Sequence, residues 1–155
     1  MQDRENKGSK SESSTLHRES DSEDEEFNRT YSQQLKSIQE MLKKEYSGAQ
    51  VLNTLTTLGN DIAALKSVPT ALFSFLKAQD KIEGLFESNP FQRTLELAMT
   101  FGGDADTIMS MAGALAGAYY GKAAIPSYLI SLCEGVEDAE SQADKLYELI
   151  TAHNT

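Results

Sequence analysis

The sequence predicts an all-α fold, and three features carry this prediction. From Tyr31 onward, apolar side chains recur at the spacing that places them on one face of a helix. We find no segment with the alternation of apolar and polar residues that is typical of a half-buried strand. Glycine and proline fall between the periodic segments, where they favour the end of one helix or the start of the next.

The chain divides by composition into two parts. Its 155 residues are enough for one domain with a modest core. Residues 1–30 contain almost no large apolar side chains and many Ser, Asp and Glu, so burial cannot offset the entropy of ordering them. We therefore predict a disordered acidic tail over residues 1–30 and a helical domain over residues 31–155.

The first two predicted helices each have one apolar face. On the first helix, these side chains are Tyr31, Leu35, Ile38, Met41 and Leu42. On the second, they are Val51, Leu52, Leu55 and Leu58. We expect a break at Ser47–Gly48 to end the first helix. Gly59 follows the second, at a position that favours a residue free to adopt positive φ.

The third and fourth helices are predicted from a proline and a turn. Ser67-Val68-Pro69 is expected to start the third helix, because proline lacks an N–H that the first turn does not use. This helix is nearly all apolar and is therefore expected to be central; its large side chains are Leu72, Phe73, Phe75 and Leu76. Ser88-Asn89-Pro90 is predicted to form a turn, with a further helix over residues 91–99.

The C-terminal third begins where Gly102-Gly103 interrupts the chain. Residues 107–120 are rich in Ala and Gly, and because glycine weakens an isolated helix, we expect this segment to pack closely against its neighbours. Ile125-Pro126 opens a further segment, in which Cys133 is expected to be a core residue. A closing amphipathic helix is predicted from Ala139, Ala143, Leu146, Leu149 and Ile150.

Charge and cysteine content exclude several classes of function. The formal net charge is −10 with no cluster of Lys or Arg, which disfavours direct binding to nucleic acid or to anionic lipid. Cys133 is the single cysteine, so a disulfide framework is excluded and a reducing, intracellular compartment is expected. The N-terminus lacks the pattern of a signal peptide, and residues 108–120 are too few to span a bilayer.

One motif has chemical content. Asp104, Asp106 and Thr107 follow the glycine pair and offer the hard oxygen ligands that Mg²⁺ prefers. The residues alone leave an alternative open, in which Asp104 or Asp106 only caps the next helix. An EF-hand is excluded because no Glu closes the loop, and His17 and His153 lie where neither is a credible catalytic base.

These residues also carry a resemblance to a known family. Residues 102–108 and the Ala/Gly stretch 111–121 resemble the C-terminal signature of the ADP-ribosylglycohydrolases. Residues 58–64, 67–71 and 131–135 are similar to the animal branch, which removes ADP-ribose from serine and degrades poly(ADP-ribose), activities of the DNA damage response. The resemblance runs from about Tyr31 to the C-terminus.

The resemblance implies a helical fold and a site with two Mg²⁺ ions. Asp104, Asp106 and Thr107 match three of the metal ligands, and Ile62 matches a position that lies against the bound ADP-ribose. The implied partners are ADP-ribosylated protein or poly(ADP-ribose), with no membrane and no direct DNA or RNA binding. The implied locations are the nucleus and the cytoplasm, or the mitochondrion.

The sequence departs from the family pattern in two ways. Asp61 stands where the family has the second glycine of Gly-Asn-Gly, and this puts an extra carboxylate near the expected substrate loop. The family's Thr-Asp-Asp ligand set and its catalytic Glu have no counterpart, so no catalytic residue is assigned in this chain. We therefore expect half of a metal site in a fragment, a short isoform or an incomplete gene product, with apolar surface exposed. The alternative is a non-catalytic helical module that binds a partner.

Overall fold

The computed structural model describes residues 30–85 and 89–153, and every regular element within these ranges is a helix. This confirms the predicted all-α class. The prediction of a disordered tail over residues 1–30 lies outside the described residues, apart from Thr30. The division of the chain into residues 1–30 and 31–155 therefore stays a prediction.

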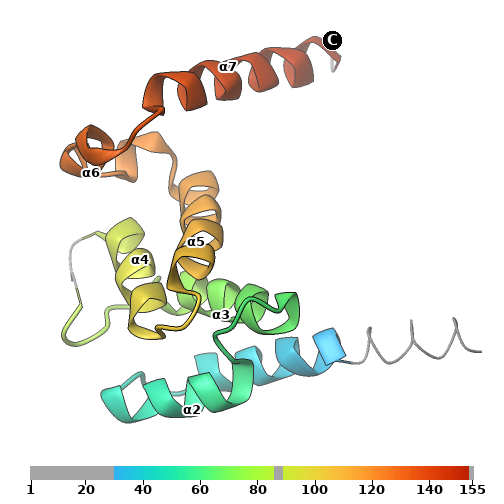
Figure 1. The fold of residues 1–155 in the computed structure, drawn as a ribbon, viewed down its shortest axis with the longest axis vertical. Coiled ribbons are helices and arrows are strands. Elements are labelled where there is room, and N and C mark those ends of the chain that lie inside the picture. Colours follow the sequence, from blue (N-terminus) through green and yellow to red (C-terminus); the bar gives the residue numbers. More distant parts are fainter. Residues whose placement is uncertain (1–29, 86–88, 154–155) are drawn as a thin grey trace, which may run out of the picture.

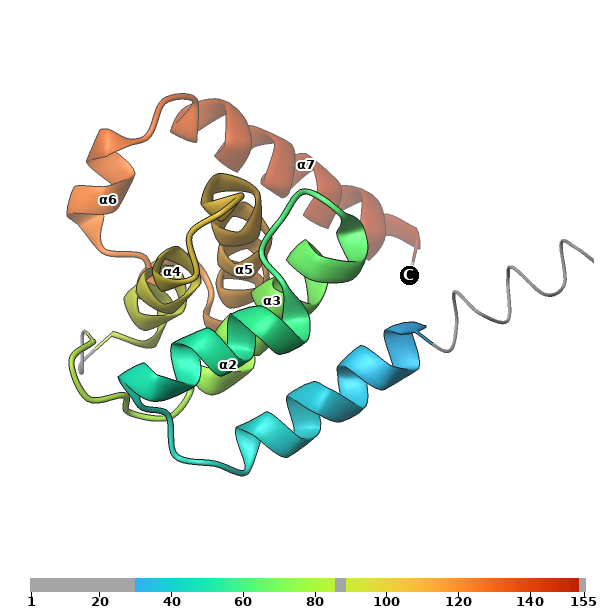
Figure 2. The same ribbon diagram turned by 60° about the horizontal axis from the view of Figure 1, so that its bottom comes forward.

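The first helix and α2 lie at one end of the molecule (Figures 1 and 2). The described part of the first helix covers residues 30–42, so it ends before the break that we predicted at Ser47–Gly48. That pair instead marks the start of α2 (Gly48–Leu58), with Ser47 at its N-cap. Gly59 ends α2 with a φ of +87°, which confirms the predicted positive-φ residue.

Helix α3 spans Ala64–Lys77, and the prediction that Ser67–Pro69 begins it was wrong. Pro69 lies inside the helix, where its missing N–H leaves the carbonyl of Leu65 without the usual helical donor. The side chain of Gln34 in the first helix donates to this carbonyl through Nε2 at 3.3 Å. A contact from a residue distant in sequence therefore allows α3 to begin before its proline.

The prediction that α3 is central was correct. It packs against α2, α4 (Pro90–Thr100) and α5 (Ala105–Tyr120). Phe73 is 1% exposed, in the core cluster that joins α3 to the first helix, α2 and α4. The buried members of that cluster are Ile38, Met41, Leu58, Phe73, Ala78, Ile82, Leu97 and Phe101.

Helices α4 and α5 position the glycine turn between them. Asn89 caps α4 by accepting a hydrogen bond from the backbone N–H of Gln92, so the helix begins next to the predicted turn. Small side chains let α3, α4 and α5 approach closely; their buried contacts are Ala71, Ala98, Ile108 and Ala112. A Cβ on Gly113 would lie 3.2 Å from Cδ2 of Leu95. The close packing predicted for the Ala/Gly segment is confirmed.

The chain ends in three further elements, the first two of which pack against the core cluster of Phe75, Phe91 and Ala116. These are η1 (Lys122–Ala124), α6 (Ser127–Leu132) and α7 (Val136–His153). Figure 1 shows α7 at the opposite end of the molecule from α2. Lys122 Nζ and Glu140 Oε1 form an ion pair at 2.5 Å. None of the helices in the described ranges combines the length and the apolarity needed to cross a membrane.

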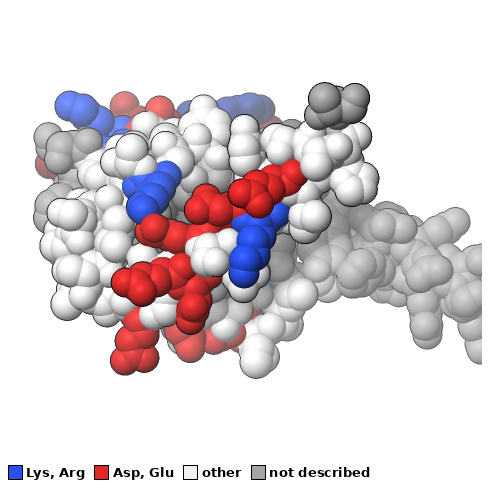
Figure 3. Space-filling view, turned by 90° about the horizontal axis from the view of Figure 1, so that it is seen from above, with Lys and Arg blue, Asp and Glu red and all other residues white. Residues whose placement is uncertain are grey.

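Helix α7 confirms the predicted closing amphipathic helix, but its apolar face is not covered. All residues from 141 to 153 are exposed, and Leu146, Tyr147 and Leu149 are each more than half exposed. Acidic side chains gather on the surface seen from the α7 end of the molecule (Figure 3). The expectation that this chain exposes apolar surface is therefore met at α7.

Cys133 was predicted to be a core residue, and this was wrong. The thiol is exposed, as are all residues from 131 to 135. Cys133 follows the six-residue helix α6, and the preceding Leu132 is 77% exposed. Of this apolar run, Leu129 packs against the buried cluster of Phe75, Phe91 and Ala116, whereas none of the described elements covers Leu132 and Cys133.

We expect the exposed thiol of Cys133 to react in the folded protein. Ellman's reagent should modify it without denaturant at a rate within about threefold of the rate in urea, because no residue in the described part of the chain shields the sulfur. A Cys133→Ser variant is the control and should give no colour. A rate that rises more than about a hundredfold on unfolding would show that the thiol is buried.

Candidate metal site

The turn between α4 and α5 presents the predicted metal ligands. Helix α4 ends at Thr100 and α5 begins at Ala105, two residues before the predicted start at residue 107. Gly102 and Gly103 both adopt positive φ, at +60° and +62°, which side chains with a Cβ rarely adopt. The glycine pair thus lets the chain reverse within four residues and places Asp104 at the N-terminus of α5.

Asp104 occupies the N-cap position of α5 without acting as a side-chain cap. Within the part of the chain that the structure describes, its carboxylate makes no capping hydrogen bond. Its Oδ2 is buried and has no hydrogen-bond partner there. Buried polar atoms are nearly always paired, because desolvation without a partner is costly. The capping alternative therefore does not account for the Asp104 side chain.

Asp106 and Thr107 follow in the first turn of α5. Contact with the Asp104 side chain lowers the pKa of Asp106, and hydrogen bonds from the backbone N–H groups of Thr107 and of Asp106 itself lower it further. Asp106 is exposed and Thr107 is partly buried. The site thus holds two neighbouring carboxyl groups at the positive end of a helix dipole, with a hydroxyl beside them.

This donor set fits a hard divalent cation. Carboxylate and hydroxyl oxygens are the ligands that Mg²⁺ prefers, and an ion would supply the partner that Asp104 Oδ2 lacks. No group of three His, Cys, Asp or Glu side chains in residues 30–85 and 89–153 is arranged to hold a metal. Asp104, Asp106 and Thr107 therefore offer a partial ligand set in the described part of the chain.

The loop between α2 and α3 carries the residue predicted to contact substrate. Ile62 is 83% exposed, so its side chain is available to a ligand. Asp61, the departure from the family pattern, accepts from the backbone N–H of Ala63 at 2.9 Å and from Lys66 Nζ at 2.5 Å. The bond from Lys66 is the main cause that lowers the pKa of Asp61. The extra carboxylate is thus paired with a cation from the first turn of α3.

The structure brings this loop into contact with the glycine turn. The backbone N–H of Asp104 donates to the carbonyl of Asn60 at 2.8 Å. The side chain of Asn60 donates through Nδ2 to the carbonyl of Phe101, also at 2.8 Å. Sequence reasoning matched the string around Asn60 but assigned this residue no role. Its position next to Gly59, in the segment that resembles the family, was the signal available.

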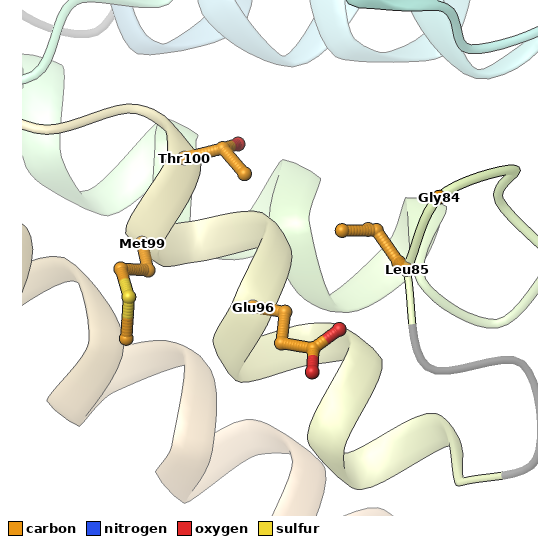
Figure 4. A pocket seen from close by; sticks show the side chains of 5 residues that line it. All are labelled: Gly84, Leu85, Glu96, Met99 and Thr100. Atoms are coloured by element: carbon orange, nitrogen blue, oxygen red, sulfur yellow. The ribbon is translucent and has the colours of Figure 1, made fainter.

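A separate hollow of about 730 Å³ lies beside α4. Figure 4 shows its lining, with Glu96, Met99 and Thr100 from α4 and Gly84 and Leu85 from the segment after α3. None of the predicted site residues lines it, so it is not part of the candidate metal site.

Comparison with known proteins points in the same direction as the motif. A model of the ADP-ribosylglycohydrolase family matches residues 6–155. The chain is 42% identical over 120 residues to "ADP-ribosylhydrolase ARH3" from Gallus gallus, which covers 77% of this chain and 32% of that protein. The protein of the same name from Homo sapiens is 41% identical over 124 residues, covering 78% of this chain and 33% of that one.

The alignment covers only part of each relative's length. The Danio rerio protein of the same name is 41% identical over 128 residues, which cover 80% of this chain but 34% of that protein. The chain thus spans about a third of the length of the curated relatives it matches. About two thirds of each relative's sequence lies outside the aligned segment.

Proposed function

Because this chain belongs to the ADP-ribosylglycohydrolase family, we propose that it supplies part of a Mg²⁺-dependent site that hydrolyses bonds to ADP-ribose. The proposed substrates are serine-linked ADP-ribose on modified protein and poly(ADP-ribose). The bond broken joins C1″ of the ribose to the oxygen of the acceptor, and water supplies the new hydroxyl. The family membership supports the reaction class, and the names of the relatives support the hydrolase branch.

The observation that carries this proposal is Asp104 Oδ2, which is buried and has no hydrogen-bond partner among the described residues. A buried carboxylate oxygen without a donor costs free energy, and proteins retain such groups mainly where a ligand or ion completes them. Asp106 lies beside it with a lowered pKa, so it remains a carboxylate at neutral pH. Oxygen donors from two neighbouring carboxyl groups favour a hard divalent cation over a neutral ligand.

The residues of this chain have separate tasks in the proposed site. Asp104, Asp106 and Thr107 would hold the Mg²⁺ ions. Bound Mg²⁺ would orient the ribose hydroxyls, stabilise developing negative charge and offset the net charge of −10 toward a pyrophosphate. Ile62 offers an exposed apolar surface to the ADP-ribose. The general base is not assigned to any residue of this chain, and we propose that the complete site needs the second ligand set of its family.

Metal binding to the isolated chain tests the proposal directly. We expect Mn²⁺, a paramagnetic substitute for Mg²⁺, to broaden the amide NMR signals of residues 103–108 selectively, and excess Mg²⁺ to restore them. Asp104→Asn should abolish this selective broadening, because the amide cannot replace an anionic ligand. Asp144→Asn on α7 makes the same chemical change at an exposed aspartate and should leave it intact. Broadening spread equally over α7 and the glycine turn would contradict the proposed site.

The exposed face of α7 favours a second candidate function. A chain whose Leu146, Tyr147 and Leu149 are more than half exposed has a surface suited to binding another polypeptide. On this interpretation the chain is a non-catalytic helical module with a partner. Hydrolysis that depends on Asp104 would exclude this interpretation as the sole function.

A further inference from the structure

One asparagine holds both ends of the turn that presents the metal ligands. The Asn60 side chain donates to the carbonyl of Phe101, and the Asn60 carbonyl accepts from the N–H of Asp104; both distances are 2.8 Å. The two bonds lie on either side of Gly102 and Gly103. The four-residue turn is thus fastened at its first and last residue to a single residue that is 41 positions away in sequence from Phe101.

Both partners of Asn60 are groups that the helices leave without a donor or acceptor. The carbonyl of Phe101 lies just after the last turn of α4, and the N–H of Asp104 lies at the first turn of α5. Neither position has a partner within its own helix. The Phe101 residue is 2% exposed, so water is a poor substitute for the Asn60 amide. Asn60 therefore satisfies two polar groups that would otherwise be left unpaired.

The contact is also close enough to exclude any other residue at position 103. A Cβ on Gly103 would lie 2.2 Å from the Asn60 carbonyl oxygen and 2.6 Å from Nδ2. The backbone of the turn thus rests directly on Asn60. A glycine at position 103 is required by this contact as well as by its φ.

Asn60 is itself held in place from both sides. On one side, the carbonyl of Gly59 accepts a hydrogen bond from Thr70 Oγ1 at 2.5 Å, and Thr70 is fully buried in α3. On the other side, Asp61 is fastened to Ala63 and to Lys66. Because its neighbours on both sides are hydrogen-bonded to α3, Asn60 is fixed relative to α3, and its own hydrogen bonds fix the turn relative to α3 as well.

From this geometry we propose that Asn60 is a positioning residue for the metal ligands. Its side-chain amide sets the backbone of residues 101–104, and so directs the carboxylate of Asp104, while its own loop carries Ile62. The metal-binding turn and the substrate-contacting loop are thereby coupled through one side chain. This inference rests on the proposed function for the role of Asp104 and Ile62, but the contacts of Asn60 do not depend on it.

The experiment compares three asparagine variants of the whole chain. Asn60→Ala removes the side chain, and Asn60→Asp keeps its shape but replaces the N–H donor by an oxygen that faces the Phe101 carbonyl. Asn53→Ala is the matched control, because Asn53 is an exposed asparagine on the neighbouring helix α2. Comparison of the two Asn60 variants separates the hydrogen bond from the packing of the side chain.

The first readout is amide hydrogen exchange without metal. In both Asn60 variants we expect the Asp104 N–H to exchange about tenfold faster than in the unmutated chain, whereas core amides such as Phe73 change much less. Asn53→Ala should change neither. Equal acceleration at Asp104 and Phe73 would mean that Asn60 contributes only to global stability and would overturn the inference. Normal exchange in Asn60→Asp alone would overturn the role of the donor.

The second readout is the affinity for Mn²⁺, which is measured from the broadening of the amide NMR signals of residues 103–108. Both Asn60 variants should weaken it about tenfold, an effect that outer-shell partners of metal ligands commonly have. Unchanged affinity in both would overturn the positioning role. If the unmutated chain shows no selective broadening, the proposed metal site fails, and the exchange readout alone decides whether Asn60 positions the turn. Failure of the two proposals is thus distinguishable.

Discussion

Replacing Asp104 with alanine is expected to lower release of ADP-ribose by at least about a hundredfold in an enzyme with both halves of the metal site. Residues that only orient metal ligands commonly contribute up to that factor, so a direct ligand should contribute no less. A suitable enzyme is the Gallus gallus relative with its matched segment replaced by that of this chain, since the two are 42% identical there. Release from a serine-ADP-ribosylated peptide in Mg²⁺ is the measurement.

Three controls make this result specific. Asp144→Ala in α7 removes an exposed aspartate outside the turn and should leave the rate unchanged. The helical circular-dichroism signal of the Asp104→Ala chimera should match that of the parent. The isolated chain should show no turnover, because the described residues offer only a partial ligand set. Equal rates for the Asp104→Ala chimera and its parent would show that this carboxylate does not bind a catalytic metal.

Gly103→Ala is expected to cost roughly 2 to 5 kcal/mol of unfolding free energy, from strain at positive φ and from overlap with Asn60. The added Cβ would lie 2.2 Å from a backbone oxygen, and a backbone atom cannot move away as the end of a flexible side chain can. A loss of this size is a large part of the stability of a domain. Urea unfolding followed by circular dichroism measures it.

Gly102→Ala is the matched control for this prediction. Gly102 has nearly the same φ, +60° against +62°, but a Cβ there would meet no atom within 4 Å. Its cost should therefore be limited to the strain of the left-handed conformation, about 1 to 2 kcal/mol. The difference between the two variants isolates the contact with Asn60. Equal destabilisation by both substitutions would show that the turn does not rest on that residue.

Several features of the fold were predictable from local sequence, because local spacing is enough to define them. Periodic apolar side chains mark the helices, and Gly59 ends α2 because its positive φ suits a helix terminus. The small residues of α5 indicated close packing, and Ala112 and Ala116 are fully buried. The motif at Gly102–Thr107 was also visible, since its ligands are neighbours in sequence.

The predictions that were wrong concern contacts between distant residues. Pro69 lies inside α3 because Gln34 compensates the carbonyl that it leaves unpaired. Cys133 is exposed because no described helix covers the end of the apolar run at Leu132, although Leu129 earlier in that run packs on the core. The missing capping hydrogen bond and the burial of Oδ2 at Asp104 were likewise not visible in a short motif, and metal binding there stays a prediction.

By itself, then, the sequence determined the helices, their apolar faces and the identity of the acidic motif, because each depends on residues a few positions apart. Tertiary structure alone decided that Asn60 contacts Phe101 and Asp104 and that Lys66 pairs with Asp61. It also decided that Asp104 Oδ2 is buried without a donor from residues 30–85 and 89–153. The physical reason is that burial and pairing are properties of the space between helices. Which side chains are buried and which polar groups are paired depends on how α3 and α5 pack, and no short window of sequence contains that information.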